Sequence, residues 1–352
     1  MAKFNRFVLA TALGITMTFT VSAQDANITP KPVEYASVTT QATTTVGSPV
    51  SREDTISRAA AVYATYQSSV TELRQHPFSS ASDIDAALTN LGGQNPGKLT
   101  NGWLAYSALV ASQSTEYQAS VRDIDSFYGR ETLLTGLRNN YHYARTLDGG
   151  DAAVSSALSA INADSRRLTS TAAAVKEQAY SLQGVSWAKA RVSNSGAKAD
   201  SIRATAVSGP VPRSSLLAAM ASTTTNAAFA QAGGSGAPSL WDGVTSAAST
   251  IRFPTLSSRG FSSRTLRVRS GKERIADRIA TLAAYRIIGE DRSAVGAIQS
   301  TMSDRQVTSC INMAQLNLQQ CVAAAHNQFE IPFCIGEHAL ADVGQCFGNM
   351  SN

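Results

Sequence analysis

The chain has 352 residues, of which 16% are charged and 7% are aromatic, and its formal net charge is +5. This length is enough for one or two domains with a hydrophobic core. The segment 252–274 alone carries seven basic residues and one acid, a net charge of +6, so the rest of the chain sums to −1. This distribution excludes a uniformly basic surface, such as many nucleic-acid-binding proteins have.

The first 23 residues have the pattern of a secretory signal peptide. Lys3 and Arg6 precede an apolar run over 7–21, and Val21-Ser22-Ala23 fits the small-x-small rule for cleavage after Ala23. The run is shorter than the ~20 residues that a spanning helix needs, and a retained N-terminal anchor is the alternative. We expect the mature protein to be periplasmic or secreted from a bacterium, with no spanning segment.

Residues 24–50 contain threonines and prolines without an apolar period, which predicts a disordered leader. A helical core domain is predicted over 51–203. Its first helix carries a stripe of apolar residues at alternating steps of three and four: Ile56, Ala59, Tyr63, Tyr66, Val70 and Leu73. The stripe indicates a helix that packs on its own domain. The alternative is a short coiled-coil contact with a partner, in which Tyr63 and Tyr66 belong to a contact surface.

Most of the aromatic residues of this domain lie within 100–147, which we expect to form the main core. Further helices are predicted over 151–162 and 164–191. The alternating pattern of Val, Ile, Thr and aromatic residues that marks strands is nearly absent. The sequence therefore predicts an all-α fold, with a multi-helix core domain, a flexible basic middle segment and a C-terminal helical hairpin.

The range 204–271 has low complexity and predicts a linker with one helix near 214–231. Its basic part, 252–274, is a candidate contact surface for anionic lipid head groups, lipopolysaccharide or wall polymers. The arginines that we single out there are Arg259, Arg264, Arg267 and Arg269. Nucleic acid is not an expected partner outside the cytoplasm, and a solvated loop is the alternative interpretation.

All four cysteines lie in the last part, 272–352, and are placed almost symmetrically about one point. A helical hairpin that turns near 327–332 pairs Cys310 with Cys346 and Cys321 with Cys334, as two nested disulfides. Cys346 is 12 residues after Cys334 and so about 120° out of phase on an ideal helix. The pairing therefore requires an irregularity in the second helix. A zinc or redox site is disfavoured because no Cys-x-x-Cys spacing is present.

Several short patterns resemble catalytic motifs without completing them. The Gly-rich stretch 92–100 has Leu99 where a phosphate-binding loop needs Ser or Thr. Two Ser-x-x-Lys matches, at 186–189 and 195–198, lack the downstream motifs of penicillin-binding enzymes. A cluster of carboxylates accompanies the aromatic stretch and provides candidates for glycan hydrolysis, although no spacing singles out an acid and a base: Glu116, Asp123, Asp125 and Glu131.

Three stretches resemble an exported proteobacterial protein family that has no assigned activity. They are Trp103-Leu104-Ala105-Tyr106, Ala179-Tyr180-Ser181-Leu182-Gln183 with Trp187, and the run from Asn317 through Cys334. The resemblance implies no catalytic residues. It implies only that the aromatic region and the cysteine hairpin belong to one architecture.

From the sequence we expect a non-enzymatic structural or interaction protein of the cell envelope, without a metal or a cofactor. Its partner would be an envelope protein or an anionic envelope component. The first alternative is an envelope hydrolase that acts on a glycan or a peptide, with its catalytic pair near Trp103 and Glu116. A carrier of a small ligand is the second alternative.

Overall fold

The computed structural model describes residues 54–352 apart from 248–249, 254–265, 290–291, 349 and 351–352. The predicted signal peptide and leader, as well as Arg259 and Arg264, lie outside the described residues. Within the described residues the predicted all-α class is confirmed, because helices make up nearly all of the regular structure and the only two strands have three residues each. These are β1 (Thr245–Ala247) and β2 (Thr250–Arg252), which form a short antiparallel hairpin.

Two helices that cross closely form the centre of the core. They are α1 (Thr55–Gln75) and α3 (Pro96–Ala111). Each begins at a side chain that accepts a backbone N–H, Asp54 for α1 and Asn95 for α3, as capping residues do. From Leu99 onward α3 is buried at almost every position, so this helix contacts other elements all around.

Gly102 permits the close crossing of α1 and α3. A Cβ atom at this position would lie 2.7 Å from the carbonyl oxygen of Ala59 and 2.8 Å from the backbone nitrogen of Tyr63. Both atoms belong to the backbone of α1, so no side chain can move aside to make room. The glycine is therefore required by the packing of two helices and not by a turn.

Replacing Gly102 by Ala is expected to lower the free energy of unfolding by about 2 kcal/mol, because overpacking outweighs the better helix propensity of alanine. Urea unfolding followed by circular dichroism measures this change. Gly97→Ala, on the same helix, is the matched control, since its added Cβ meets only Asn95 Oδ1 at 3.5 Å. An equal effect of both substitutions would contradict the packing argument.

A buried group of aromatic rings connects distant parts of the chain to this centre. Tyr63 of α1 lies 5.2 Å from Tyr106 of α3 and 5.6 Å from Phe347, measured between ring centroids. Trp103 stacks on Phe347 at 5.3 Å, and Tyr106 contacts Trp241 at 5.5 Å. The predicted aromatic core over 100–147 is present in part, because Phe127 and Tyr128 are exposed. Trp241 and Phe347 complete it from the middle segment and the C-terminus.

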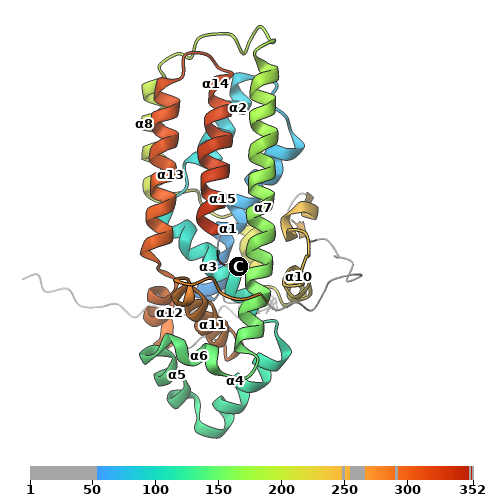
Figure 1. Cartoon of the computed structure of the whole chain (residues 1–352), viewed down its shortest axis with the longest axis vertical. Coiled ribbons are helices and arrows are strands. Elements are labelled where there is room, and N and C mark those ends of the chain that lie inside the picture. Colours follow the sequence, from blue (N-terminus) through green and yellow to red (C-terminus); the bar gives the residue numbers. More distant parts are fainter. Residues whose placement is uncertain (1–53, 248–249, 254–265, 290–291, 349, 351–352) are drawn as a thin grey trace, which may run out of the picture. The chain divides into compact units, whose positions relative to one another are not determined.

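Three C-terminal elements lie against α7 (Gly150–Leu182), as Figure 1 shows in red beside green. They are α14 (Glu330–Cys334), the π-helix η5 (Ile335–Ala341) and α15 (Asp342–Phe347). The helix α13 (Arg305–Ala324) packs on the other side of these elements, and it also packs against α8 (Ser195–Ser208). Residues 51–352 form one compact unit, so the cysteine hairpin is part of the same body as the helices before it.

The predicted disulfide pairing is confirmed. Cys310 bonds to Cys346 and Cys321 bonds to Cys334, so the shorter loop lies inside the longer one. The irregularity that this pairing required is η5, which separates Cys334 from Cys346. One extra residue in a π-bulge makes 12 residues turn like 11, which reduces the phase error from about 120° to about 20°.

At the other end of α7, a group of shorter helices packs around α11 (Glu273–Ile287), shown at the bottom of Figure 1. The group consists of α4 (Thr115–Tyr128), α6 (Tyr141–Thr146) and α12 (Val295–Met302), and α5 (Arg130–Asn139) packs on α4 and α6. Tyr117 of α4 connects this helix to α6 and α11. Its hydroxyl lies 3.0 Å from the carbonyl oxygen of Ala144 on α6 and 2.9 Å from that of Ala280 on α11.

The range 204–271, interpreted from the sequence as a linker with one helix near 214–231, contains two helices there instead. They are α9 (Ser214–Ala221) and α10 (Asn226–Ala232), which pack on α1 and α3 respectively. Burial of Leu216, Met220 and Phe229 explains why this low-complexity stretch is ordered. The remaining elements are α2 (Ala81–Ala87), the π-helix η1 (Leu88–Gly92) and 3₁₀ turns at Thr223–Thr225, Leu240–Gly243 and Arg292–Ala294.

Candidate functional site

Tyr63 and Tyr66 do not form a contact surface, so that assignment was wrong. Their exposed fractions are 0% and 1%, and both hydroxyl groups are used inside the protein. Tyr63 donates to Asp164 Oδ2 at 2.9 Å, and Tyr66 donates to the carbonyl oxygen of Ala339 at 2.7 Å. The stripe on α1 packs on its own domain, which was the first of the two interpretations.

Asp164 and Arg167 form a buried polar network between α7, α1 and the turn at 239–243. Besides Tyr63, the Asp164 carboxylate accepts hydrogen bonds from Ser239 Oγ at 2.6 Å and from Trp241 Nε1 at 3.1 Å. Burial raises the pKa of the Asp164 carboxyl to about 6, against the lowering effect of these donors and of Arg167. Because the group is fully enclosed, it stabilises the core and is not accessible to a substrate.

Arg167 occupies the other half of this network. Its guanidinium donates to Gln67 Oε1 and Thr71 Oγ1, both at 2.7 Å, and to Asp242 Oδ1 at 3.1 Å. All three partners lie outside α7, so the Arg167 side chain connects this long helix to α1 and to the 239–243 turn. Such a network requires every donor to have an acceptor, because an unpaired buried group is costly.

The described end of the basic segment is extended and has two different faces. Leu266 and Val268 pack against the core, whereas Arg267 and Arg269 are exposed, as the two-residue period of an extended chain requires. The Leu266 N–H donates to Ser155 Oγ at 2.8 Å, and the Arg269 N–H donates to the carbonyl oxygen of Met350 at 2.9 Å. This part is therefore fixed in place, with two predicted arginines on its outer side.

Next to this segment lies a cleft of about 500 Å³ between the ends of three helices. We call it the arginine cleft, after Arg274 and Arg278 of α11 and Arg305 of α13. The turn in which the Lys272 N–H donates to the Arg269 carbonyl leads directly into it. Arg278 is mostly buried and donates to the carbonyl oxygens of Ser300 and Thr301, at 3.0 and 2.8 Å. Its guanidinium is therefore held in a fixed position.

The charge around the arginine cleft is largely uncompensated. Asp304 is the one acid in its lining, and its carboxylate accepts the N–H groups of Gln306 and Val307 at the start of α13. Within the described residues no carboxylate pairs with the five cations that form the basic patch. These are Arg267, Arg269, Lys272, Arg274 and Arg305.

Sequence reasoning missed Arg278 and Arg305. Arg278 follows the basic segment closely, but on an amphipathic helix it has no distinguishing signal. Arg305 is separated from Arg274 by a whole helix, and only the fold places the start of α13 near the start of α11, so that both side chains line one cleft. The net charge of the basic segment was sufficient to predict the region of the contact surface, but it did not identify Arg278 and Arg305.

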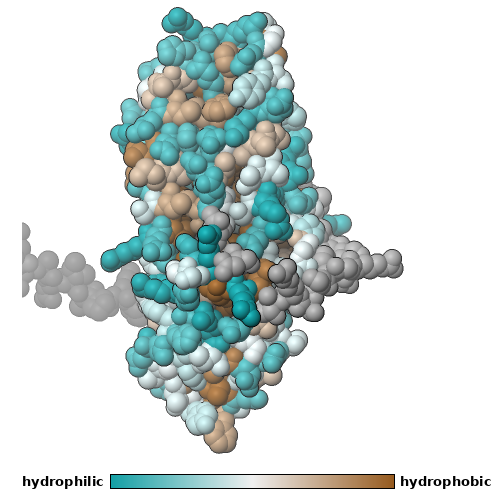
Figure 2. Space-filling view, in the orientation of Figure 1, coloured by the Kyte–Doolittle hydropathy of each residue, from teal (hydrophilic) through white to brown (hydrophobic). Residues whose placement is uncertain are grey.

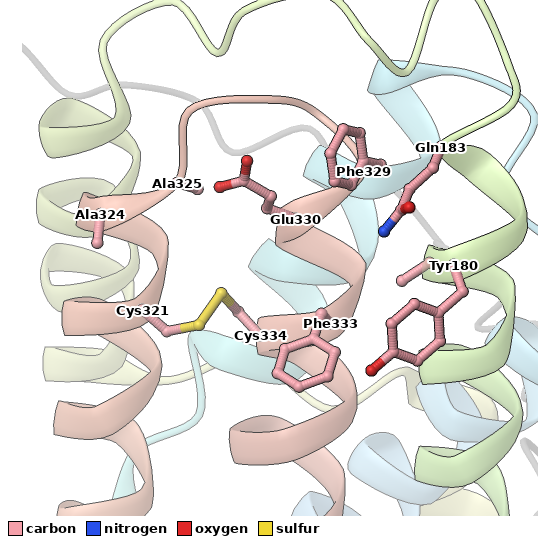
Figure 3. Close-up of a pocket in the computed structure, with 10 residues that line it drawn as sticks. Tyr180, Gln183, Cys321, Ala324, Ala325, Phe329, Glu330, Phe333 and Cys334 are labelled. Carbon is pink, nitrogen blue, oxygen red and sulfur yellow. A yellow bond between two sulfur atoms is a disulfide. The ribbon is translucent and has the colours of Figure 1, made fainter.

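A second hollow, the cystine pocket, lies beside the Cys321–Cys334 disulfide and has a volume of about 380 Å³ (Figure 3). It lies between the C-terminal ends of α7 and α13 and the start of α14. Aromatic side chains and small residues form most of its lining: Tyr180, Phe329 and Phe333 with Ala179, Ala324 and Ala325. On this side of the molecule, Figure 2 shows hydrophobic residues in separate patches among hydrophilic ones.

The candidates for hydrolysis do not converge on a cleft. Trp103 is fully buried and Glu116 is exposed, so the two do not share a surface. Asp125 accepts two hydrogen bonds from Arg130, each 2.7 Å long. The hydrogen bonds from Arg130 lower the pKa of this carboxyl. An acid catalyst needs the opposite shift.

The two Ser-x-x-Lys matches do not form a catalytic pair either. Ser195 Oγ donates to the carbonyl oxygen of Ala323 at 2.9 Å, and Lys198 forms an ion pair with Asp85. Lys189 is exposed. A nucleophile activated by a lysine needs that lysine beside it and free to accept a proton, and neither match has this arrangement.

Comparisons with known protein families, with curated proteins and with solved structures give no match for this chain. In the residues that the structure describes, no helix has both the length and the apolar character to cross a membrane. The same residues contain no group of three or more His, Cys, Asp or Glu side chains placed to hold a metal ion.

Proposed function

We propose that this protein is an exported, non-enzymatic interaction protein of the bacterial cell envelope, and that it holds an anionic envelope component at the arginine cleft. The observation that carries the proposal is the basic patch, whose five cations have no carboxylate partner in the described part of the chain. Some exposed arginines elsewhere, such as Arg74 and Arg213, are paired with acids. Other exposed arginines among the residues that the structure describes are single, so the patch is distinguished by the cleft that Arg274 and Arg305 share.

The export part of the proposal rests on two features. Residues 1–23 have the three-part pattern of a signal peptide. Two disulfides connect the C-terminal helices, and disulfides persist in oxidising compartments such as the periplasm or the cell exterior. Both features support a periplasmic or secreted location.

The ligand chemistry follows from the guanidinium groups. Arginine binds phosphate and carboxylate groups through two parallel N–H donors, and the bond is stronger when the guanidinium is already held in position. Arg278 is fixed by two carbonyl oxygens and lies over the ring of Tyr141 at 5.2 Å. Arg274 and Arg305 are exposed at the cleft and are available for a ligand that carries negative charge.

Removing Arg274 and Arg305 together, each replaced by Gln, is expected to weaken binding to phosphatidylglycerol vesicles about 30-fold at low salt. The reason is that each basic side chain near an anionic surface contributes about 1 kcal/mol. Vesicle co-sedimentation at 20–150 mM salt measures this effect, with neutral phosphatidylcholine vesicles as the reference.

A double variant that removes the same charge elsewhere provides the control. Arg122→Gln with Arg166→Gln changes two exposed arginines on α4 and α7, neither of which lines the arginine cleft. We expect this variant to bind within threefold of the wild type. Equal binding by wild type and the Arg274/Arg305 double variant would remove the cleft from the proposal.

A further inference from the structure

The cystine pocket exists because small residues stand where a helical bundle normally places large ones. Protein interiors are close-packed, so facing helix ends usually fill the space between them. Here Ala179 of α7 and Ala324 and Ala325 at the end of α13 line the hollow together with the compact Cys321–Cys334 bond. The remaining hollow of about 380 Å³ has the size of a small-molecule site.

Aromatic side chains stand at the mouth of the pocket and remain open to solvent. Tyr180 is 57% exposed and Phe333 is 38% exposed, and their ring centroids lie 6.3 Å apart. Figure 3 shows both rings beside the pocket, with Phe329 just before the start of α14. When a ligand covers exposed apolar surface of this kind, the removal of that surface from water favours binding.

The polar groups of the pocket are few and differ in availability. The Glu330 carboxylate already accepts the His326 N–H at 2.8 Å and the Asn327 N–H at 3.3 Å. In contrast, the Tyr180 hydroxyl and the Gln183 amide have no hydrogen-bond partner among the described residues, and Figure 3 shows the Gln183 amide directed between Phe329 and Tyr180. The pocket thus offers an apolar lining, two free polar groups and one negative charge.

We propose that the cystine pocket binds an uncharged, mostly apolar small molecule whose single polar group is held by Tyr180 and Gln183. An anionic ligand is disfavoured, because Glu330 lines the site and no cation does. Lys176, which lies over the Phe333 ring, is paired with Glu337. This separates the pocket from the arginine cleft, whose ligand must be negatively charged. The inference goes beyond the proposed function and does not depend on it.

The first test is a fluorescence titration of the full, oxidised protein with N-phenyl-1-naphthylamine, an uncharged aromatic amine. We expect saturable binding at one site. Ala324→Trp fills the pocket from an exposed position, and Phe333→Ser removes one wall, so each should weaken binding at least tenfold. Tyr180→Phe, which keeps the ring and removes the hydroxyl, should weaken binding by about threefold.

Two controls separate this site from general stickiness. Phe127→Ser removes a side chain that is 81% exposed and lies on α4, outside the pocket, and should leave the affinity unchanged. The anionic probe 8-anilino-1-naphthalenesulfonate should bind at least tenfold more weakly than the uncharged probe. Thermal unfolding shows whether each variant is folded. Wild-type affinity in both Ala324→Trp and Phe333→Ser, or an equal loss in Phe127→Ser, would overturn the proposal.

Discussion

Replacing Asp164 by Asn is expected to lower the free energy of unfolding by about 3 kcal/mol at neutral pH. The carboxylate accepts three buried hydrogen bonds, from Tyr63, Ser239 and Trp241. An amide has only one acceptor atom, so its NH₂ group would face donors that have no other partner. Arg167 would also lose a nearby negative charge and keep only Asp242.

Urea unfolding of the two proteins measures this difference. Asp151→Asn is the matched control, because Asp151 lies on the same helix but its side chain is 81% exposed. We expect that control to change stability by less than about 0.5 kcal/mol. A loss below about 1 kcal/mol in Asp164→Asn would show that the network does not hold α7 to the core.

The same residue predicts a dependence of stability on pH. Burial raises the pKa of Asp164 to about 6 in the folded protein, above the ordinary value for the unfolded chain. Between these two values the folded state binds more protons than the unfolded state, so stability falls as pH rises. The contribution is full below about pH 4 and is lost as pH rises through 6.

Asp164→Asn has no titrating group at this position and serves as the reference. The stability difference between wild type and this variant should therefore be larger at pH 4.5 than at pH 7.5. Unfolding measured at both values tests the sign, and other titrating groups cancel in the difference. A difference that grows with pH would show that the carboxyl pKa is lowered and not raised.

Removing the outer disulfide, by changing Cys310 and Cys346 to Ser, is expected to lower stability by about 3 to 4 kcal/mol. Removing the inner one, Cys321 with Cys334, should cost about 3 kcal/mol, because it closes a shorter loop. The stability contributed by the outer disulfide is smaller when the inner disulfide is present, since the inner disulfide already shortens the flexible loop between Cys310 and Cys346.

The four-serine variant is the control for these measurements. Added reductant should bring the wild type down to the stability of that variant and should not affect the variant itself. Peptide mapping without reductant should yield the pairs Cys310–Cys346 and Cys321–Cys334. A loss below about 1 kcal/mol for either pair would show that the bond does not restrain the unfolded chain.

Features that depend on local spacing could be predicted from the amino-acid sequence alone. Helical periodicity and the lack of strand patterns were sufficient for the all-α class. The symmetric placement of four cysteines gave the nested pairing, and the 120° phase error at Cys346 required the irregularity that η5 provides. The basic segment was also visible, because charge is additive along the chain.

Contacts between side chains that are far apart in the chain could not be predicted and became visible only in the folded protein. Periodicity shows that α1 has an apolar face but not what covers it, so the burial of Tyr63 against Asp164, Trp241 and Phe347 was not predictable. Arg305 joins Arg274 for the same reason. The cystine pocket depends on which small residues come together in its lining at three helix ends. Such contacts are set by packing between helices, and no short window of sequence records them.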